Sequence, residues 1–286
     1  MTRVAIIAAM AGELKPLVRG WEHERRDGVD VWRWRFDEGE WVATCAGAGQ
    51  LAATRAFAEV EKDGAITSVI SAGWVGALSE DYRPGRAYRI TGVVDSQTGE
   101  RFETAGVVAS ESEGMIEAHP SDKNKDVARM GHPVGDTAAT FPRSQKRDLG
   151  HPIGGECLLV TNPKVADAAE KKRLAAAYGA GLVDMEAAAV ARLAGMRGIP
   201  FYCFKGVSDA FSEDLPDFNR FITPNGQFQT ARLLFFVLPR PWHWPALIRM
   251  GENSKQASQS LAECVFDFLD ERGHIRKRNG YPNIKP

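Results

Sequence analysis

Residues 181–195, GLVDMEAAAVARLAG, constrain the fold of this chain more than any other stretch. A short apolar run leads into Asp184-Met185-Glu186, and an alanine-rich segment typical of a helix follows it. After a Gly-Ile-Pro turn, a second apolar run (201–204) continues to Ser208-Asp209. The order strand, helix, strand predicts the right-handed crossover unit of a parallel sheet.

Both apolar runs deliver an acidic side chain to the end of a strand. Glu186 follows the first run and Asp209 follows the second. Open α/β sheets bind their ligands at the carboxyl ends of the strands, so two acids at equivalent ends of adjacent strands favour a site. The alternative is that Asp184 or Glu186 only caps the helix, whose positive N-terminal end favours a carboxylate.

Further strand-to-helix turns precede this unit. Residues 3–9 form a continuous apolar run, as expected for a central parallel strand, and Glu13 lies at the turn behind it. The alternative is that Glu13, in the first turn of the helix, only interacts favourably with the positive end of the helix dipole. Glycine pairs at 47–49 and 73–76 follow two more predicted strands, where they would allow a ligand close to the backbone.

The remaining pattern predicts one large α/β domain, a three-layer mixed twisted sheet flanked by helices, over residues 1–238. Residues 111–155 are rich in Pro, Gly, Asp and Lys, and we interpret them as a lid-like insertion. The insertion carries three histidines without the spacing of metal ligands (His119, His132 and His151). We therefore predict no metal site.

Aromatic and charged residues alternate over 31–36, which predicts a half-buried antiparallel strand with a return at 41–45. Its aromatic face is formed by Trp32, Trp34 and Phe36. Because this is more aromatic surface than one core needs, we expect the chain to form a homodimer.

Composition excludes several classes of protein. The net charge is −1 and the lysines and arginines are scattered, so no nucleic-acid partner is expected. The run Lys171-Lys172-Arg173 is assigned to a solvated face.

Four cysteines without metal spacing fit a reducing cytoplasm. The N-terminal apolar run is too short for a membrane span and is interpreted as a first strand, not a signal peptide. We expect a cytoplasmic protein.

Taken in order, these turns resemble the nucleoside phosphorylase/nucleosidase superfamily, and within it the methylthioadenosine/S-adenosylhomocysteine nucleosidases. The resemblance covers roughly residues 3–209. Its specific matches are Asp184-Met185-Glu186-Ala187 and Ser208-Asp209, whereas the glycine turns are common to many folds. It implies a small-molecule nucleoside substrate, cleavage of the N-glycosidic bond, and no cofactor.

The resemblance also implies roles for individual residues. Asp209 would protonate purine N7, Glu186 would hold the ribose 2′ and 3′ hydroxyls, and Glu13 would activate water. Such a cleavage needs a leaving-group acid, a stabiliser of positive charge on the sugar, and an oriented nucleophile. For this role Asp209 must be protonated or share a proton, which requires a raised pKa. The residues expected to contact the substrate are Met10, Trp74, Gly76, Val165, Met185, Lys205 and Ser208.

The roles of two of these residues do not follow directly from the resemblance. Trp74 replaces the small residue that the family has between the glycines, so it would remodel the pocket wall. Lys205 stands where the nucleosidases have a basic residue near the water, and it could equally be the ion-pair partner of Glu186.

Water is the expected nucleophile. Phosphorylases have cations at two places that read Ala9–Glu13 and Ile70–Ala72 in this chain, and Glu13 would repel phosphate. One alternative is a phosphorolytic enzyme, including the hopanoid-associated phosphorylases, which residues 95–102 and Arg240-Pro241 also resemble and which remove adenine from an adenosyl lipid. Another alternative is a nucleoside-binding protein without activity.

Residues 239–286 are predicted to form an extended elbow (239–245), an amphipathic helix (254–269) and a polar tail from 272, packed on the same domain. The favoured interpretation is that they cover a sheet edge. The alternative is that they serve a large or lipophilic 5′ substituent, with weak contact to a membrane surface through the tryptophans and arginines.

Overall fold

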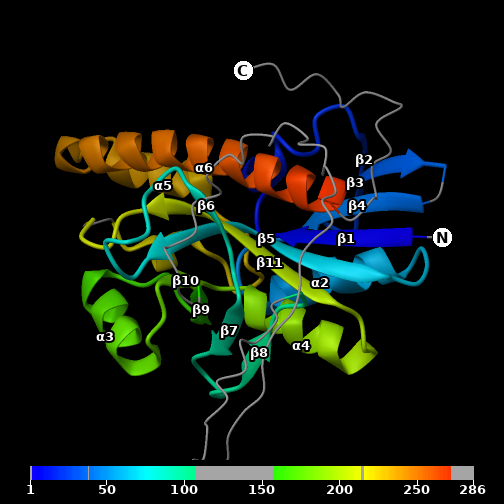
Figure 1. The fold of residues 1–286 in the computed structure, drawn as a ribbon. Coiled ribbons are helices and arrows are strands. Elements are labelled where there is room, and N and C mark those ends of the chain that lie inside the picture. The colour runs from blue at the N-terminus through cyan, green and yellow to red at the C-terminus, as the bar shows by residue number, and fades with distance from the viewer. Residues whose placement is uncertain (1, 38, 107–156, 214–215, 272–286) are drawn as a thin grey trace, which may run out of the picture. The chain divides into compact units, whose positions relative to one another are not determined.

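The computed structural model describes residues 2–37, 39–106, 157–213 and 216–271, all within one compact unit. They form a mixed sheet of 11 strands with helices on both faces, as Figure 1 shows. The predicted three-layer α/β class is therefore confirmed. The predicted lid at 111–155, with its three histidines, and the polar tail from 272 lie outside the described residues.

The sheet runs in the order β2-β3-β4-β1-β5-β10-β9-β7-β8, and β11 pairs with both β5 and β6. The strands are β1 (Thr2–Ala8), β2 (Glu22–Arg26), β3 (Val29–Phe36), β4 (Gly39–Cys45), β5 (Ser68–Ala77), β6 (Ala87–Arg89), β7 (Gly92–Asp95), β8 (Arg101–Glu103), β9 (Leu158–Thr161), β10 (Leu182–Asp184) and β11 (Phe201–Asp209).

Helices pack on both faces of the sheet, and each face has its own hydrophobic core cluster. Alanine-rich α2 and α4 pack on one face, and α1 and α6 pack on the other. The helices are α1 (Ala11–Leu14), α2 (Gln50–Glu61), α3 (Ala168–Tyr178), α4 (Ala187–Arg197), α5 (Thr230–Val237) and α6 (Trp244–Glu271), with the 3₁₀ turns η1 (Phe218–Phe221) and η2 (Pro241–His243). None of the helices in the described ranges is long and apolar enough to cross a membrane.

The central and antiparallel strands follow the sequence patterns. β1 lies between β4 and β5, parallel to both, and is buried on both faces after its first residue. β3 and β4 pair in antiparallel register, with Trp34 opposite Trp41. Trp32, Trp34 and Phe36 are partly buried against the core that includes α6. Their rings leave less free aromatic surface than the sequence indicated, and the homodimer remains a prediction.

The predicted crossover unit is wrong in its pairing. β10 and β11 are not neighbours, because each pairs with β5, β10 in the antiparallel and β11 in the parallel direction. β5 can pair with both because it is ten residues long and continues through Gly73 and Gly76, which were predicted to form a loop. Gly76 lies opposite both Val183 and Asp209, so the two strand ends still converge at one point.

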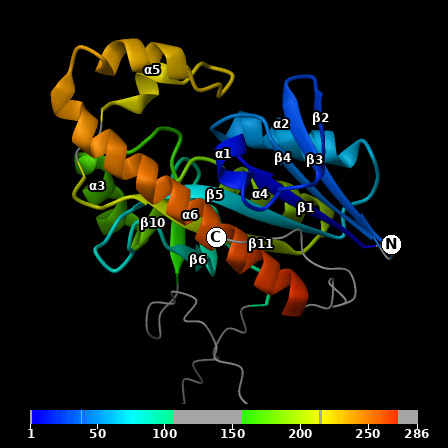
Figure 2. The same ribbon diagram turned by 90° about the horizontal axis from the view of Figure 1, so that it is seen from above.

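The C-terminal segment differs from the predicted extended elbow. Helix α6 begins at Trp244, and the residues before it form the turn η2. Pro241 and Pro245 stand in first-turn positions, where a helix tolerates a missing N–H. From Ser254 onward α6 buries an apolar stripe against β5, β6 and β11, while most of residues 244–251 are exposed or only half-buried. Figure 2 shows α6 crossing the sheet, with α5 beyond its N-terminal end.

Candidate active site

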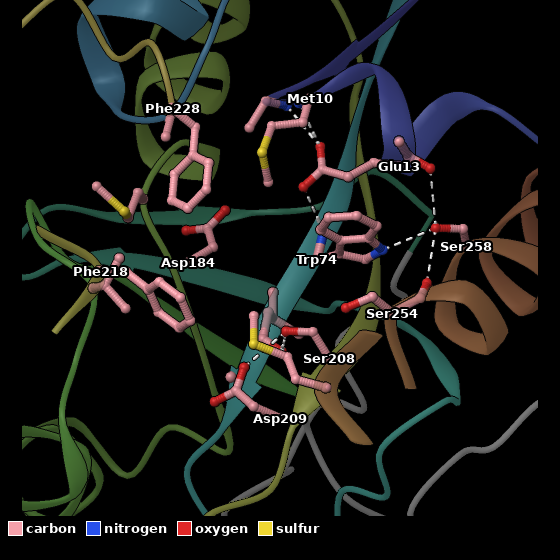
Figure 3. A pocket seen from close by; sticks show the side chains of 18 of the residues that line it. Met10, Glu13, Trp74, Asp184, Ser208, Asp209, Phe218, Phe228, Ser254 and Ser258 are labelled. Atoms are coloured by element: carbon pink, nitrogen blue, oxygen red, sulfur yellow. Dashed lines mark hydrogen bonds between the residues drawn. The ribbon is translucent and has the colours of Figure 1, made fainter. Parts of the chain in front are cut away.

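A cavity of about 750 Å³ lies where β1, β5, β10 and β11 end. Every predicted site residue lines it except Lys205: Met10, Glu13, Trp74, Gly76, Val165, Met185, Glu186, Ser208 and Asp209. These predicted residues therefore lie together around one cavity, although β10 and β11 reach it by a different strand pairing. Figure 3 shows Glu13, Trp74 and Asp209 around the central space, with Phe218 and Phe228 opposite Trp74.

Glu13 is fixed by backbone amides rather than exposed at a helix start. Its Oε2 accepts N–H groups of Ala9 (2.8 Å) and Met10 (2.9 Å), and its Oε1 accepts the N–H of Trp74 (3.0 Å). A side chain on Gly73 would come within 3.2 Å of the same oxygens. Burial raises the pKa of Glu13, although the backbone hydrogen bonds and the charge of Lys205 act in the opposite direction. Oε1 retains a lone pair for one further donor.

Glu186 occupies the N-cap position of α4, but its side chain forms no capping hydrogen bond with that helix. Its Oε1 accepts the N–H of Gly49 in the glycine turn at 2.6 Å, and its Oε2 accepts the N–H of Met185 at 3.2 Å. Asp184 is the residue that caps α4, because its Oδ2 accepts the amide of Ala187 at 2.9 Å. Glu186 is thus oriented toward the cavity.

The charge environment of Glu186 is unfavourable to a carboxylate. Burial and the charge of Asp184 raise the pKa of Glu186 to about 8, against the opposing effect of Lys205. In the free protein, protonation of Glu186 therefore relieves the repulsion among the acids of the pocket.

Lys205 lies behind the cavity instead of lining it. It is 1% exposed, and its Nζ contacts Asp184 Oδ2 at 2.8 Å and Ser71 Oγ at 3.1 Å. Burial lowers the pKa of Lys205, but the charges of Asp184 and other neighbours outweigh burial and raise it overall. Of the two predicted roles, Lys205 is an ion-pair partner, with Asp184 rather than Glu186.

Asp209 has a partner that the sequence did not reveal. Its Oδ1 accepts the hydroxyl of Ser208 at 2.7 Å, and its Oδ2 accepts the ammonium group of Lys171. Lys171 is only 2% exposed, and its Nζ also donates to the carbonyl oxygen of Ala210 at 2.7 Å. The assignment of Lys171 to a solvated face is therefore wrong, whereas Lys172 and Arg173 are exposed as predicted. Asp209 was expected to be protonated or to share a proton, and the group it contacts is the ammonium group of Lys171.

Gly76 makes this arrangement possible. A Cβ atom at this position would lie 3.1 Å from Asp209 Oδ2 and 3.3 Å from Lys171 Cε. It would also lie 3.3 Å from a methyl group of Val183 on β10. Because Gly76 has no side chain, Asp209, Lys171 and Val183 of β10 can all pack directly against the backbone of β5.

Trp74 forms a fixed wall of the pocket. Its indole Nε1 donates to Ser258 Oγ at 2.9 Å, and a side chain on Gly12 would meet the ring at 3.1 Å. Ser258 belongs to α6 and Gly12 to α1, so the indole ties both helices to β5. Beyond it the cavity continues to apolar residues of α5 and α6, namely Leu233, Leu247 and Met250.

Sequence reasoning missed Lys171 and the aromatic side of the pocket. Lys171 and Leu174 are the buried residues of α3, and their spacing places the lysine on the inward stripe, which is the signal that could have identified it. Phe218 and Phe228 come from the irregular stretch after β11. Their position depends on contacts such as the amide of Ala48 with the carbonyl of Gly226 (2.7 Å). No sequence signal predicted that packing.

The described part of the chain offers no metal centre, since no group of three His, Cys, Asp or Glu side chains in it could hold an ion. Its polar groups are instead carboxylates paired with ammonium groups or backbone amides. Such a set suits proton transfer and the binding of hydroxyl groups.

Comparison with known families gives a match over most of the chain. The family described as the phosphorylase superfamily matches residues 3–234. No curated protein matches the chain.

Solved structures share the fold at low identity. A mutant of the 5′-methylthioadenosine/S-adenosylhomocysteine nucleosidase of Helicobacter pylori, with 5′-methylthioadenosine in its active site, is 14% identical with a TM-score of 0.61, covering 95% of this chain and 99% of its own. Futalosine hydrolase of the same organism is 14% identical, with a TM-score of 0.61 and coverage of 94% and 98%. The 5′-methylthioadenosine nucleosidase of Arabidopsis thaliana is 17% identical, with a TM-score of 0.60 and coverage of 98% of both chains. At these identities the likeness establishes the fold.

Proposed function

The chain belongs to the phosphorylase superfamily, and from that premise we propose that it cleaves the N-glycosidic bond of a purine nucleoside with water as the nucleophile. The observation that carries this proposal is the convergence of Glu13, Glu186 and Asp209 on one cavity. The structural neighbours support it, because they are named as nucleosidases and a futalosine hydrolase.

In the proposed reaction the bond between sugar C1′ and the base breaks, and its electron pair goes to the purine. A proton from the Asp209–Lys171 pair reaches N7 of the departing base. In its ionised form, Glu186 accepts hydrogen bonds from the two ribose hydroxyls and places negative charge near the cationic sugar. Water, held by the free lone pair of Glu13, adds to C1′ and loses its proton to that carboxylate.

The environment of Glu13 favours water over phosphate. An oxyanion at this end of the sheet would need the amides of Ala9, Met10 and Trp74, and the carboxylate of Glu13 already occupies all three. The nearest buried cations, Lys171 and Lys205, are paired with Asp209 and Asp184. Phosphate at this position would therefore meet the negative charge of Glu13, and the three amides are already engaged.

Base release with and without phosphate tests this proposal. Adenosine, 5′-methylthioadenosine and inosine should be compared, and we expect release of the free base at equal rates in both buffers, with free sugar as the second product. A strict phosphate requirement and a sugar 1-phosphate product would identify the phosphorolytic alternative. Saturable binding of a nucleoside without any release would identify a binding protein.

We further propose that Lys171 is the proton reservoir for Asp209. An ionised carboxylate in an ion pair has no proton to give, whereas the ammonium group of Lys171 can return one through Oδ2 as the base departs. After release, the amine of Lys171 would recover a proton from solvent. Both groups line the cavity, so the route to the base needs no movement of the backbone.

Replacing Lys171 with methionine should lower kcat and change its pH dependence. Without the ammonium group only a protonated Asp209 can act, so the alkaline limb of the pH–rate profile should move to lower pH. At neutral pH we expect a loss of about 10²-fold. Lys172→Met, one residue away on the exposed face of α3, is the matched control and should leave the profile unchanged. If the alkaline limb of the pH–rate profile stays at the same pH in Lys171→Met, the lysine has only a structural role.

The extent of the cavity favours a nucleoside with a substituent on the sugar 5′ carbon. Its volume lies in the upper part of the range of about 300–1,000 Å³ for small-molecule sites. The apolar extension toward Leu233, Leu247 and Met250 would accommodate an apolar group, including that of an adenosyl lipid. In the assay above, we therefore expect 5′-methylthioadenosine to be cleaved with a higher kcat/KM than adenosine.

A further inference from the structure

The hairpin formed by α5, η2 and the first two turns of α6, residues 230–251, carries an unusual amount of exposed apolar surface. Six of the eight large hydrophobic side chains that are exposed in the described residues belong to it: Leu234, Phe235, Leu238, Trp242, Trp244 and Ile248. Phe235 is 80% exposed and Trp242 is 68% exposed. An apolar cluster of this kind on a soluble surface marks an interaction site.

The hairpin is held together by contacts between its own residues, so its exposed apolar side chains stand on a defined structure. The indole Nε1 of Trp244 donates to the carbonyl oxygen of Val237 at 2.9 Å and joins the two helices. The guanidinium group of Arg240 lies 4.1 Å from the ring centre of Phe236, which in turn contacts Phe221. Trp242 joins this packing through the ring of His243, which stacks on Phe236, and its own side chain stays exposed.

The charge around this face is of one sign. Residues 218–251 contain four arginines, Arg220, Arg232, Arg240 and Arg249, and no aspartate or glutamate. In the described part of the chain, only Arg249 among them forms an ion pair, with Glu213 at 3.4 Å. Within the described ranges, the hairpin and the residues just before it therefore combine tryptophan and phenylalanine with three arginines that form no ion pair, Arg220, Arg232 and Arg240.

We infer that this outward face of the α5–α6 hairpin docks onto an anionic lipid bilayer. Tryptophan and arginine both have apolar bodies and polar ends, which suits them to the boundary between headgroups and acyl chains. The arginines would meet the negative potential of the lipid surface, and the side chains of Phe235, Leu238 and Ile248 would enter its outer apolar layer.

A second copy of the chain fits the same face less well. A two-fold contact would place the same patch on both subunits, so Arg232 and Arg240 would meet their own copies with no acid between them. The lipid surface supplies the opposite charge. The inner side of the hairpin lines the cavity through Leu233, Leu247 and Met250, so docking would bring the cavity mouth close to the bilayer.

Co-sedimentation of the full chain with vesicles tests the inference. We expect binding to vesicles of phosphatidylcholine with phosphatidylglycerol, weaker binding to phosphatidylcholine alone, and a decrease as salt is added. The double variant Phe235→Gln/Trp242→Gln should reduce the partition coefficient at least about tenfold. Leu51→Gln/Met196→Gln is the matched control, because these side chains are 72% and 75% exposed but lie outside the hairpin.

Several outcomes would overturn the inference. They are no binding of the unaltered chain to anionic vesicles, unchanged binding of the hairpin variant, or an equal loss in the control variant. Self-association in sedimentation that the hairpin variant abolishes, without vesicle binding, would assign the face to a second copy. Thermal unfolding and cleavage of a soluble nucleoside without vesicles should be the same in all three proteins. The surface is thereby tested independently of the proposed reaction.

Discussion

Replacing Asp209 with asparagine should reduce base release by at least about 10²-fold, with binding of the nucleoside largely retained. The amide has the shape of the carboxylate, and its single oxygen can accept a hydrogen bond from Lys171 while its NH2 group faces the hydroxyl oxygen of Ser208. It cannot pass a proton from Lys171 to the departing base. Single-turnover release of adenine, measured beside the dissociation constant of the nucleoside, separates the chemical step from binding.

This variant also leaves the ammonium group of Lys171 without a negative partner, which can cost about 3–5 kcal/mol of stability. Loss of activity could then reflect unfolding. The double variant Asp209→Asn/Lys171→Met removes both charges and should recover the melting temperature while remaining inactive. Substantial turnover in Asp209→Asn, or recovery of activity in the double variant, would exclude Asp209 as the route of the proton.

Replacing Glu186 with glutamine should lower kcat/KM by about 10²- to 10⁴-fold. Hydrogen bonds to a charged group contribute about 1.5–3 kcal/mol each, and the carboxylate is positioned to accept two from the sugar. Glutamine also removes the negative charge that would stabilise the cationic sugar in the transition state. Glu59→Gln is the matched control, since Glu59 is also buried but lies on α2 outside the cavity. It should leave kcat/KM unchanged.

The same substitution should act in the opposite direction on stability. Because the pKa of Glu186 is raised from 4.5 to about 8, the folded protein holds a proton that the unfolded chain has lost between these values. The contribution of Glu186 to stability is therefore complete at low pH and is lost as the pH rises, by an amount on the order of a few kcal/mol.

Glu186→Gln removes this dependence, so its melting temperature should fall less than that of the unaltered chain between about pH 5 and about pH 8. A variant that is less stable at every pH, with normal kcat/KM, would make Glu186 a structural residue.

The sequence predicted the acids of the site because each follows a recognisable apolar strand. Glu13, Glu186 and Asp209 stand at strand ends, and the edge of a sheet brings such positions together even when the exact pairing is misjudged. The pairing itself was misjudged because β5 is longer than its apolar run suggests. It continues through two glycines that also read as a loop.

Partners on helices and irregular segments were harder to predict. Lys171 stands in a run of three basic residues, and only the orientation of α3 decides which of them turns inward. For Lys205 an ion pair with Glu186 was one of two predicted roles, and its actual partner depended on whether Asp184 or Glu186 faced into the core. Phe218 and Phe228 belong to turns whose positions follow from long-range contacts, which local sequence patterns do not encode.

The carboxylate of Glu13, held by three backbone amides, bears on the direction in which the proposed reaction can run. Phosphorolysis keeps the energy of the glycosidic bond in a sugar phosphate and is readily reversed, so a phosphorylase can rebuild nucleosides when base and sugar phosphate accumulate. Hydrolysis releases a free sugar, and the high concentration of water makes the return negligible. By filling the anion position with its own side chain, this chain would commit each substrate molecule to breakdown, whatever the supply of phosphate.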